Sequence, residues 1–178
     1  MTVEPIERLR ACQEYWTKSA SFLGGRRPIP MAQDKCRSYE AGPIKIVLED
    51  RRLTPELLKS HNAKLGMDIP DLPADELDDG GLSFHVVEAG SEVEFLRFDC
   101  FEHGPHYHYL VPGVDGTPTL RFDRIANGDM VPWAVGVMRD RMRELLEGAG
   151  AFDLAAEIDD EKLQMAITRL KSDLQKHK

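Results

Sequence analysis

Two histidines separated by one residue, His106 and His108, are the part of the sequence best suited to chemistry. They follow a turn-like Glu-His-Gly-Pro segment at 102–105, and Asp99 precedes that turn. In a β-strand alternate side chains lie on the same face, so a His-x-His pair presents both imidazoles to one side. Two imidazoles and one carboxylate form the ligand set of zinc and iron centres that keep open coordination positions. The spacing therefore makes these three residues a candidate metal site.

Strand pairing across two predicted hairpins tests whether the polar residues share one face. With 102–105 as the first turn, Asp99 lies opposite His108. With 115–116 as the second turn, His108 lies opposite Asp123. Both pairings place charged residues on one face and apolar residues on the other, so they support each other. The predicted polar face contains Arg97, Asp99, His106, His108, Arg121 and Asp123.

The other face of the predicted strands is apolar and suits covering helices. It contains Leu96, Phe98, Cys100, Tyr107, Tyr109, Val111, Leu120 and Phe122. The tyrosines that alternate with the histidines are therefore expected to serve in the core. His85 is expected opposite Leu96, as a buried or edge histidine with satisfied hydrogen bonds.

The first interpretation of the polar face is a divalent metal centre. Zinc, iron or nickel accepts nitrogen and oxygen ligands of the kind offered by His106, His108 and Asp99. His103 in the turn, or Asp123 on the last strand, could complete or replace this set. No other cofactor is indicated.

The second interpretation is acid–base chemistry without a metal. A histidine held by an aspartate has a defined tautomer, and two histidines can act as acid and base. Arg97 and Arg121 would clamp a small anionic substrate through bidentate contacts. The candidate catalytic residues are His106, His108, Asp99, Arg97 and Arg121. Under either interpretation, hydrolysis of an anionic substrate is the expected reaction.

The third interpretation is a face without catalysis. Antiparallel sheets often leave one face in water, and cross-strand Arg–Asp pairs on such a face are ordinary. The face would then serve for homodimerisation or for binding another partner. All three interpretations stay open at the level of the sequence, and so does the question of whether the protein is an enzyme.

The strand pattern resembles one found in small uncharacterised bacterial proteins, including the TumE-like toxin group. The Arg-Phe-Asp segment at 97–99 and the Pro-His-Tyr-His segment at 105–108 carry the resemblance. This chain has Phe98 where the pattern favours tyrosine, and it is longer, with helical regions at both ends. The resemblance implies a toxin-like role directed at RNA. The acidic charge of the chain argues against binding a polyanion.

Composition and charge exclude several classes of protein. The 178 residues carry a formal net charge of -8, so the basic footprint of a nucleic-acid-binding protein is missing. No run of about 18 apolar residues predicts a membrane span, and no secretory signal is visible. The three cysteines, Cys12, Cys36 and Cys100, form neither a disulfide framework nor a C-x-x-C motif. We therefore expect a cytoplasmic protein with reduced thiols.

The elements before the polar face follow from hydrophobic periodicity and helix-end signals. Helical spacing of apolar residues predicts a helix over 5–22, followed by a loop over 24–43. A β-branched run predicts a strand over 44–48. A Thr-Pro-Glu start and a terminal glycine predict a helix over 54–65. The acidic run over 68–79 predicts a solvated loop.

Period-two alternation then predicts a β-meander with short turns that contain glycine. Its strands span 82–88, 93–101, 106–111 and 118–123. Helices over 131–148 and 160–175 follow, each with an apolar stripe. The element order predicts an α+β fold, an antiparallel β-meander packed on one face by N- and C-terminal helices. We expect a single domain over 1–178 that is helical over 1–66, a meander over 82–124 and helical over 129–178.

Overall fold

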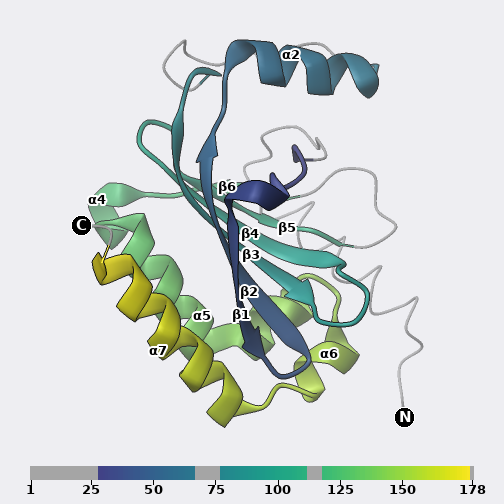
Figure 1. The fold of residues 1–178 in the computed structure, drawn as a ribbon, viewed down its shortest axis with the longest axis vertical. Helices are drawn as coiled ribbons and strands as arrows, with labels where there is room; N and C mark the ends of the chain where they lie inside the picture. The colour runs from purple at the N-terminus through teal and green to yellow at the C-terminus, as the bar shows by residue number, and fades with distance from the viewer. Residues whose placement is uncertain (1–27, 67–76, 112–117, 177–178) are drawn as a thin grey trace.

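The computed structural model describes residues 28–66, 77–111 and 118–176, and it contains a six-stranded antiparallel sheet (Figure 1). Neighbouring strands follow one another along the chain, so the sheet is a simple meander. The strands are β1 (Cys36–Ala41), β2 (Ile44–Arg52), β3 (Gly80–Glu88), β4 (Glu94–Phe101), β5 (His106–Tyr109) and β6 (Thr119–Arg121). The helical elements are η1 (Gln33–Lys35), α2 (Pro55–Lys64), α4 (Arg124–Asn127), α5 (Met130–Gly148), α6 (Phe152–Ala156) and α7 (Asp160–Lys176).

One face of the sheet is apolar, and α5 and α7 cover it (Figure 1). The fully buried core side chains include Ile44, Ile46, Phe84, Leu96, Phe98, Met138, Leu146, Ile167 and Leu170. Burial of a residue such as Phe98 contributes about 2 kcal/mol by area bookkeeping. Trp133 joins α5 to the strands, because its ring centroid lies 5.4 Å from that of Tyr107 and 4.8 Å from that of Phe122. The predicted α+β class, a meander covered on one face by helices, is confirmed.

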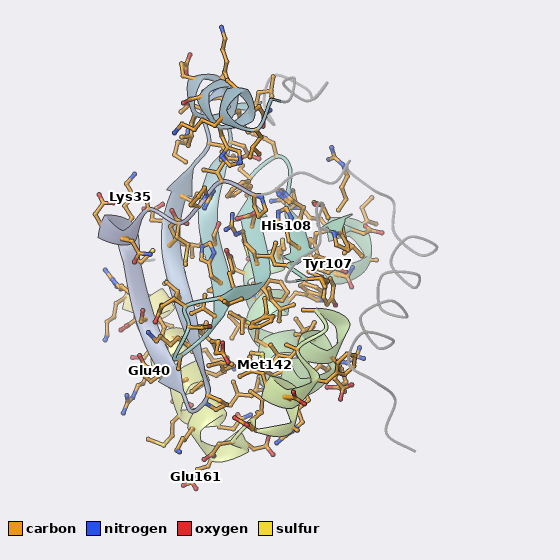
Figure 2. All side chains as sticks on the ribbon, turned by 90° about the vertical axis from the view of Figure 1, so that its right-hand side faces the viewer. Lys35, Glu40, Tyr107, His108, Met142 and Glu161 are labelled. Atoms are coloured by element: carbon orange, nitrogen blue, oxygen red, sulfur yellow. The ribbon has the colours of Figure 1, made fainter. Side chains whose placement is uncertain are left out.

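The first half of the chain agrees with the sequence prediction only in part. The helix predicted over 54–65 is confirmed as α2, where the Thr54 hydroxyl accepts a hydrogen bond from the Leu57 N–H. α2 lies beyond the end of the sheet (Figure 1 and Figure 2). The loop predicted over 24–43 is wrong in its second part, where β1 forms. β1 is an edge strand that buries only Tyr39 and Ala41, so its hydrophobic pattern is too short to reveal it.

The remaining helices are close to their predicted positions. α5 and α7 confirm the helices predicted over 131–148 and 160–175. The short helices α4 and α6 were not predicted. The helix predicted over 5–22 lies outside the described residues.

The predicted division of β4 and β5 into a polar and an apolar face is confirmed, although the pairing partners differ. Asp99 pairs with His106 rather than His108. His108 pairs with Thr119 rather than Asp123. Each partner differs by an even number of residues, and such a shift leaves every side chain on its predicted face.

The acidic loop predicted over 68–79 is described only at its end, and there the prediction is wrong for one residue. Asp78 is exposed and pairs with Arg52, as expected of a solvated acid. Asp79 is only 2% exposed. Its carboxylate accepts hydrogen bonds from backbone N–H groups of the turn between β4 and β5. The requirement for satisfied backbone donors, which charge counting ignores, explains its burial.

Replacement of Gly81 by alanine is expected to destabilise the sheet. Gly81 has a φ of +155°, and a Cβ atom there would lie 2.4 Å from the Cys100 carbonyl oxygen on β4. The strands would have to separate, so we expect Gly81→Ala to lower the free energy of unfolding by about 2 kcal/mol. Urea denaturation followed by circular dichroism measures this. Gly90→Ala is the control, because a Cβ atom at Gly90 meets no atom within 4 Å. Equal stability of the two variants would contradict the prediction.

Candidate metal centre

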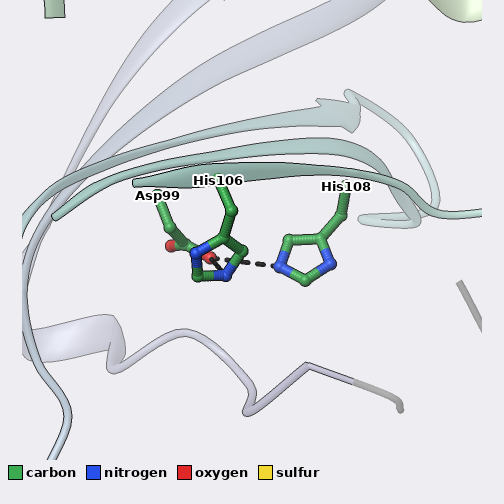
Figure 3. Close-up of side chains that lie close together, drawn as sticks. All are labelled: Asp99, His106 and His108. Carbon is green, nitrogen blue, oxygen red and sulfur yellow. Dashed lines mark ion pairs between the residues drawn. The ribbon is translucent and has the colours of Figure 1, made fainter. Parts of the chain in front are cut away.

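Asp99 on β4 and His106 and His108 on β5 bring three ligand atoms to a common point (Figure 3). Asp99 Oδ2 lies 3.4 Å from His106 Nε2 and 3.3 Å from His108 Nε2. All three ligand atoms lie within 4.8 Å of one another. A tetrahedral ion with ligands at about 2.1 Å separates those ligands by about 3.4 Å. The observed distances therefore match a divalent metal centre.

In each of the three side chains, the polar atom that faces away from this point also has a hydrogen-bond partner. His106 Nδ1 lies 2.6 Å from the Gly104 carbonyl oxygen. His108 Nδ1 lies 3.0 Å from the Thr119 hydroxyl. The Ser83 hydroxyl donates to Asp99 Oδ1. Outer contacts of this kind orient the ligands in metal proteins and tune their affinity.

These outer contacts determine where the imidazole protons lie. A carbonyl oxygen can only accept a hydrogen bond, so His106 Nδ1 carries a proton, and Nε2 has a free lone pair whenever the ring is neutral. The Thr119 hydroxyl can donate or accept, so His108 can carry its proton on either nitrogen. In one tautomer His108 Nε2 donates to Asp99, and in the other it offers a lone pair to a metal.

Burial sets the charge state of the centre. Burial lowers the pKa of His108 to about 4, so this ring is neutral at pH 7. Burial alone would raise the pKa of Asp99, but the hydrogen bond with His108, together with His106 and Arg97, holds it well below its usual range. The centre therefore presents a carboxylate and a neutral imidazole, which together attract a cation.

Solvent reaches the centre mainly at His106. The Asp99 and His108 side chains are 5% and 8% exposed, and the His106 side chain is 20% exposed. Arg121 lies opposite His106 in the β5–β6 ladder and is exposed. Directly opposed residues share a face, so the predicted proximity of Arg121 to the histidines is retained.

Arg97, a predicted substrate clamp, lies instead in a buried network beside the centre. The Arg97 side chain is 1% exposed and holds Glu94 through contacts of 2.8 and 2.6 Å. A further guanidinium N–H donates to the Ile29 carbonyl. The structure therefore places Arg97 where its donors serve the fold and not where it could clamp a substrate.

His85 belongs to the same network, as a fully buried histidine. Its Nδ1 lies 2.6 Å from Glu94, and its Nε2 lies 3.0 Å from Glu49. The expectation of a buried histidine with satisfied hydrogen bonds is confirmed. Its strand partner is Arg97 rather than the predicted Leu96, so His85 lies on the polar face and its predicted place on the apolar face is wrong. The role of Glu49 and Glu94 was not predicted, because the two glutamates lie on different strands and only the sheet brings them to one ring.

The 28–35 segment crosses the polar face and is tied to this network. The Ile29 carbonyl accepts from both Arg51 and Arg97. The Ala32 N–H donates to Glu49 at 2.9 Å. Figure 3 shows a segment from the start of the described chain passing the three side chains of the centre. The polar face is therefore partly covered and forms an interior wall, in contrast to a fully solvated sheet face.

Two predicted ligands, His103 and Asp123, do not belong to the converging group. His103 lies in the β4–β5 turn and is exposed, and its backbone N–H donates to Asp79. Asp123 caps α4 by accepting from the N–H groups of Ile125 and Ala126. The chain leaves the sheet after Arg121, which removes Asp123 from its predicted place opposite His108.

The fold and the centre define an α+β domain whose antiparallel meander carries a cluster of two histidines and one carboxylate. The chain belongs to the family described as a domain of unknown function (DUF7700), whose family model matches residues 38–174. No curated protein and no solved structure matches the chain. None of the helices in the described part of the chain is long and apolar enough to cross a membrane. The resemblance to the TumE-like group stays a prediction from the sequence.

The metal-free protein is expected to lose stability in mild acid through His108. The folded pKa of about 4 lies below the ordinary value of 6.5, so the unfolded chain takes up a proton first as the pH falls. Lowering the pH from about 7 to about 5 therefore reduces the free energy of unfolding by about 2 kcal/mol. Urea denaturation of chelator-treated protein at the two pH values measures the loss. His108→Asn should remove most of it, whereas His61→Asn on α2 should not. An equal loss in both variants would show that His108 is not the source.

Proposed function

We propose that this chain binds a divalent metal ion through Asp99, His106 and His108 and uses it to hydrolyse a small anionic substrate. The observation that supports the metal most is the direction of His106. Its Nδ1 proton is committed to the Gly104 carbonyl, so the Nε2 lone pair faces the Asp99 carboxylate at 3.4 Å. When the ring is neutral, two electron-rich groups this close repel each other unless a cation lies between them, and in the metal-free protein a proton on Nε2 fills that place.

Three protein ligands suit a catalytic ion better than a structural one. Structural zinc sites use four protein ligands, whereas catalytic sites use three and leave a position open. A bound zinc, iron or nickel ion would supply Lewis acidity and an activated water molecule. In this proposal Asp99 supplies the negative charge that retains the ion, and the two imidazoles complete its protein ligands.

The anionic substrate is proposed from the position of Arg121. This side chain is exposed and lies on the polar face directly opposite His106, the most exposed of the three proposed ligands. A guanidinium group binds a phosphate or a carboxylate through paired hydrogen bonds. Arg121 would therefore orient an anionic group beside the ion.

Metal content is the direct test of the proposed centre. We expect protein purified without a histidine tag to bind one zinc, iron or nickel ion, and Asp99→Asn, His106→Ala or His108→Ala to weaken binding more than about 100-fold. Elemental analysis and calorimetric titration with zinc measure this. His103→Ala and Asp123→Asn are matched controls outside the converging group, and asparagine retains the helix cap.

Two results would contradict the proposed metal centre. One is wild-type protein that takes up no zinc, iron or nickel. The other is an equal loss of binding in the ligand variants and in the controls. A changed molecular mass of the His106 and His108 variants in sedimentation, with no metal in the wild type, would instead support the dimerisation interpretation.

Substrate binding by Arg121 can be tested separately from metal binding. We expect Arg121→Ala to raise the KM for chromogenic phosphomonoesters or phosphodiesters about 10-fold, because a hydrogen bond to a charged group is lost. Metal content should stay unchanged, and Arg121→Lys should fall in between. Arg141→Ala on the exposed side of α5 is the control. Absence of hydrolysis by metal-loaded wild-type protein would overturn the proposed reaction, and an unchanged KM would overturn the role of Arg121.

A further inference from the structure

Asp79 lies outside the candidate centre, yet its carboxylate organises the turn that leads into β5. Oδ1 accepts from the N–H groups of Gly80 at 2.7 Å and Glu102 at 3.1 Å. Oδ2 accepts from His103 at 3.1 Å and Gly104 at 2.7 Å. Asp79 thus joins the start of β3 to the turn between β4 and β5.

Three successive backbone N–H groups, those of residues 102–104, point to this one carboxylate. Successive N–H groups in a turn form an anion-binding concavity, and here the anion is a side chain of the same chain. Asp79 is 2% exposed, and Gly104 is buried. Water therefore does not readily replace the carboxylate as the partner of these donors, and the turn depends on Asp79 for its shape.

Gly104 connects this concavity to the candidate centre. Its N–H donates to Asp79, and its carbonyl accepts from His106 Nδ1 at 2.6 Å. Pro105 continues the restraint, because its carbonyl accepts from the Phe122 N–H next to β6. A displaced turn would therefore move the carbonyl that holds the His106 ring.

We propose that Asp79 is a positioning residue for the metal centre, and that it acts through Gly104 to fix the tautomer and direction of His106. This inference rests on the proposed metal-binding function. Asp79 itself contacts neither the metal ligands nor the point where they converge. Its predicted effect is on the direction in which His106 presents Nε2.

Asp79→Asn and Asp78→Asn form a matched pair for the test. An asparagine at 79 keeps the shape but turns one acceptor into a donor that faces backbone N–H groups. Asp78 is the neighbouring acid, half exposed and paired with Arg52, and it lies outside the concavity. We expect the Asp79 variant to bind zinc about 10-fold more weakly and the Asp78 variant to match the wild type.

The His106 tautomer provides a readout that a purely structural role would not move. Long-range ¹H–¹⁵N NMR spectra of the metal-free protein should show His106 protonated at Nδ1 in the wild type and in the Asp78 variant. In the Asp79 variant we expect a mixture with the Nε2 tautomer. A lower melting temperature with unchanged zinc affinity and tautomer would overturn the inference.

The two measurements distinguish a failure of this inference from a failure of the proposed function. If the wild type binds no zinc, iron or nickel, the proposed function is overturned, while the tautomer comparison still decides whether Asp79 directs His106. If Asp79→Asn does not fold, Asp79→Glu keeps the charge, displaces the carboxylate by one methylene and is measured in the same two ways. Unchanged affinity and tautomer in that variant would likewise overturn the inference.

Discussion

The pairing of β4 with β5 is the constraint on which both the core and the candidate centre depend. On one face of the sheet, Asp99 pairs with His106. On the other face, the neighbouring pair is Phe98 and Tyr107, whose ring centroids lie 5.9 Å apart with nearly parallel planes. A slip of one residue would move the carboxylate into the helix-covered core and the aromatic rings onto the polar face. Aromatic burial on the helix side therefore fixes the register that assembles the ligands on the other side. The centre is therefore held in place by the core on the other face of the sheet.

Several charged groups are buried together on the polar face, which is costly unless each one finds a partner. The network meets this condition, because Arg97 holds Glu94, Arg51 holds Glu49 and His85 bridges the two glutamates. The Ile29 carbonyl accepts a further hydrogen bond from each of the two arginines. These bonds hold the 28–35 segment over the polar face. Exclusion of water by this cover lowers the local dielectric and strengthens attraction between Asp99 and a cation.

The sequence predicts which face each residue of β4 and β5 occupies, since alternation within these strands has a period of two, and it therefore identifies the three converging side chains. It does not predict their partners, because register depends on turn geometry. The β4–β5 turn is shaped by Asp79, which precedes β3 and carries no local signal for such a role. The β5–β6 pairing is centred two residues earlier than the predicted turn at 115–116, which places Thr119 rather than Asp123 opposite His108. β1 was missed because an edge strand buries few side chains.

The contacts of the two imidazoles bear on the choice between the proposed metal binding and acid–base catalysis by the histidines. A catalytic histidine uses one ring nitrogen to hold its carboxylate and keeps the other for the substrate. Here both histidines direct Nε2 towards Asp99, and their Nδ1 atoms are taken by the Gly104 carbonyl and the Thr119 hydroxyl. Both nitrogens of each ring therefore already face a protein oxygen in the metal-free protein. The same arrangement suits a cation, because an ion at the shared point uses both Nε2 atoms and leaves every Nδ1 contact in place. The geometry therefore favours metal binding over acid–base catalysis.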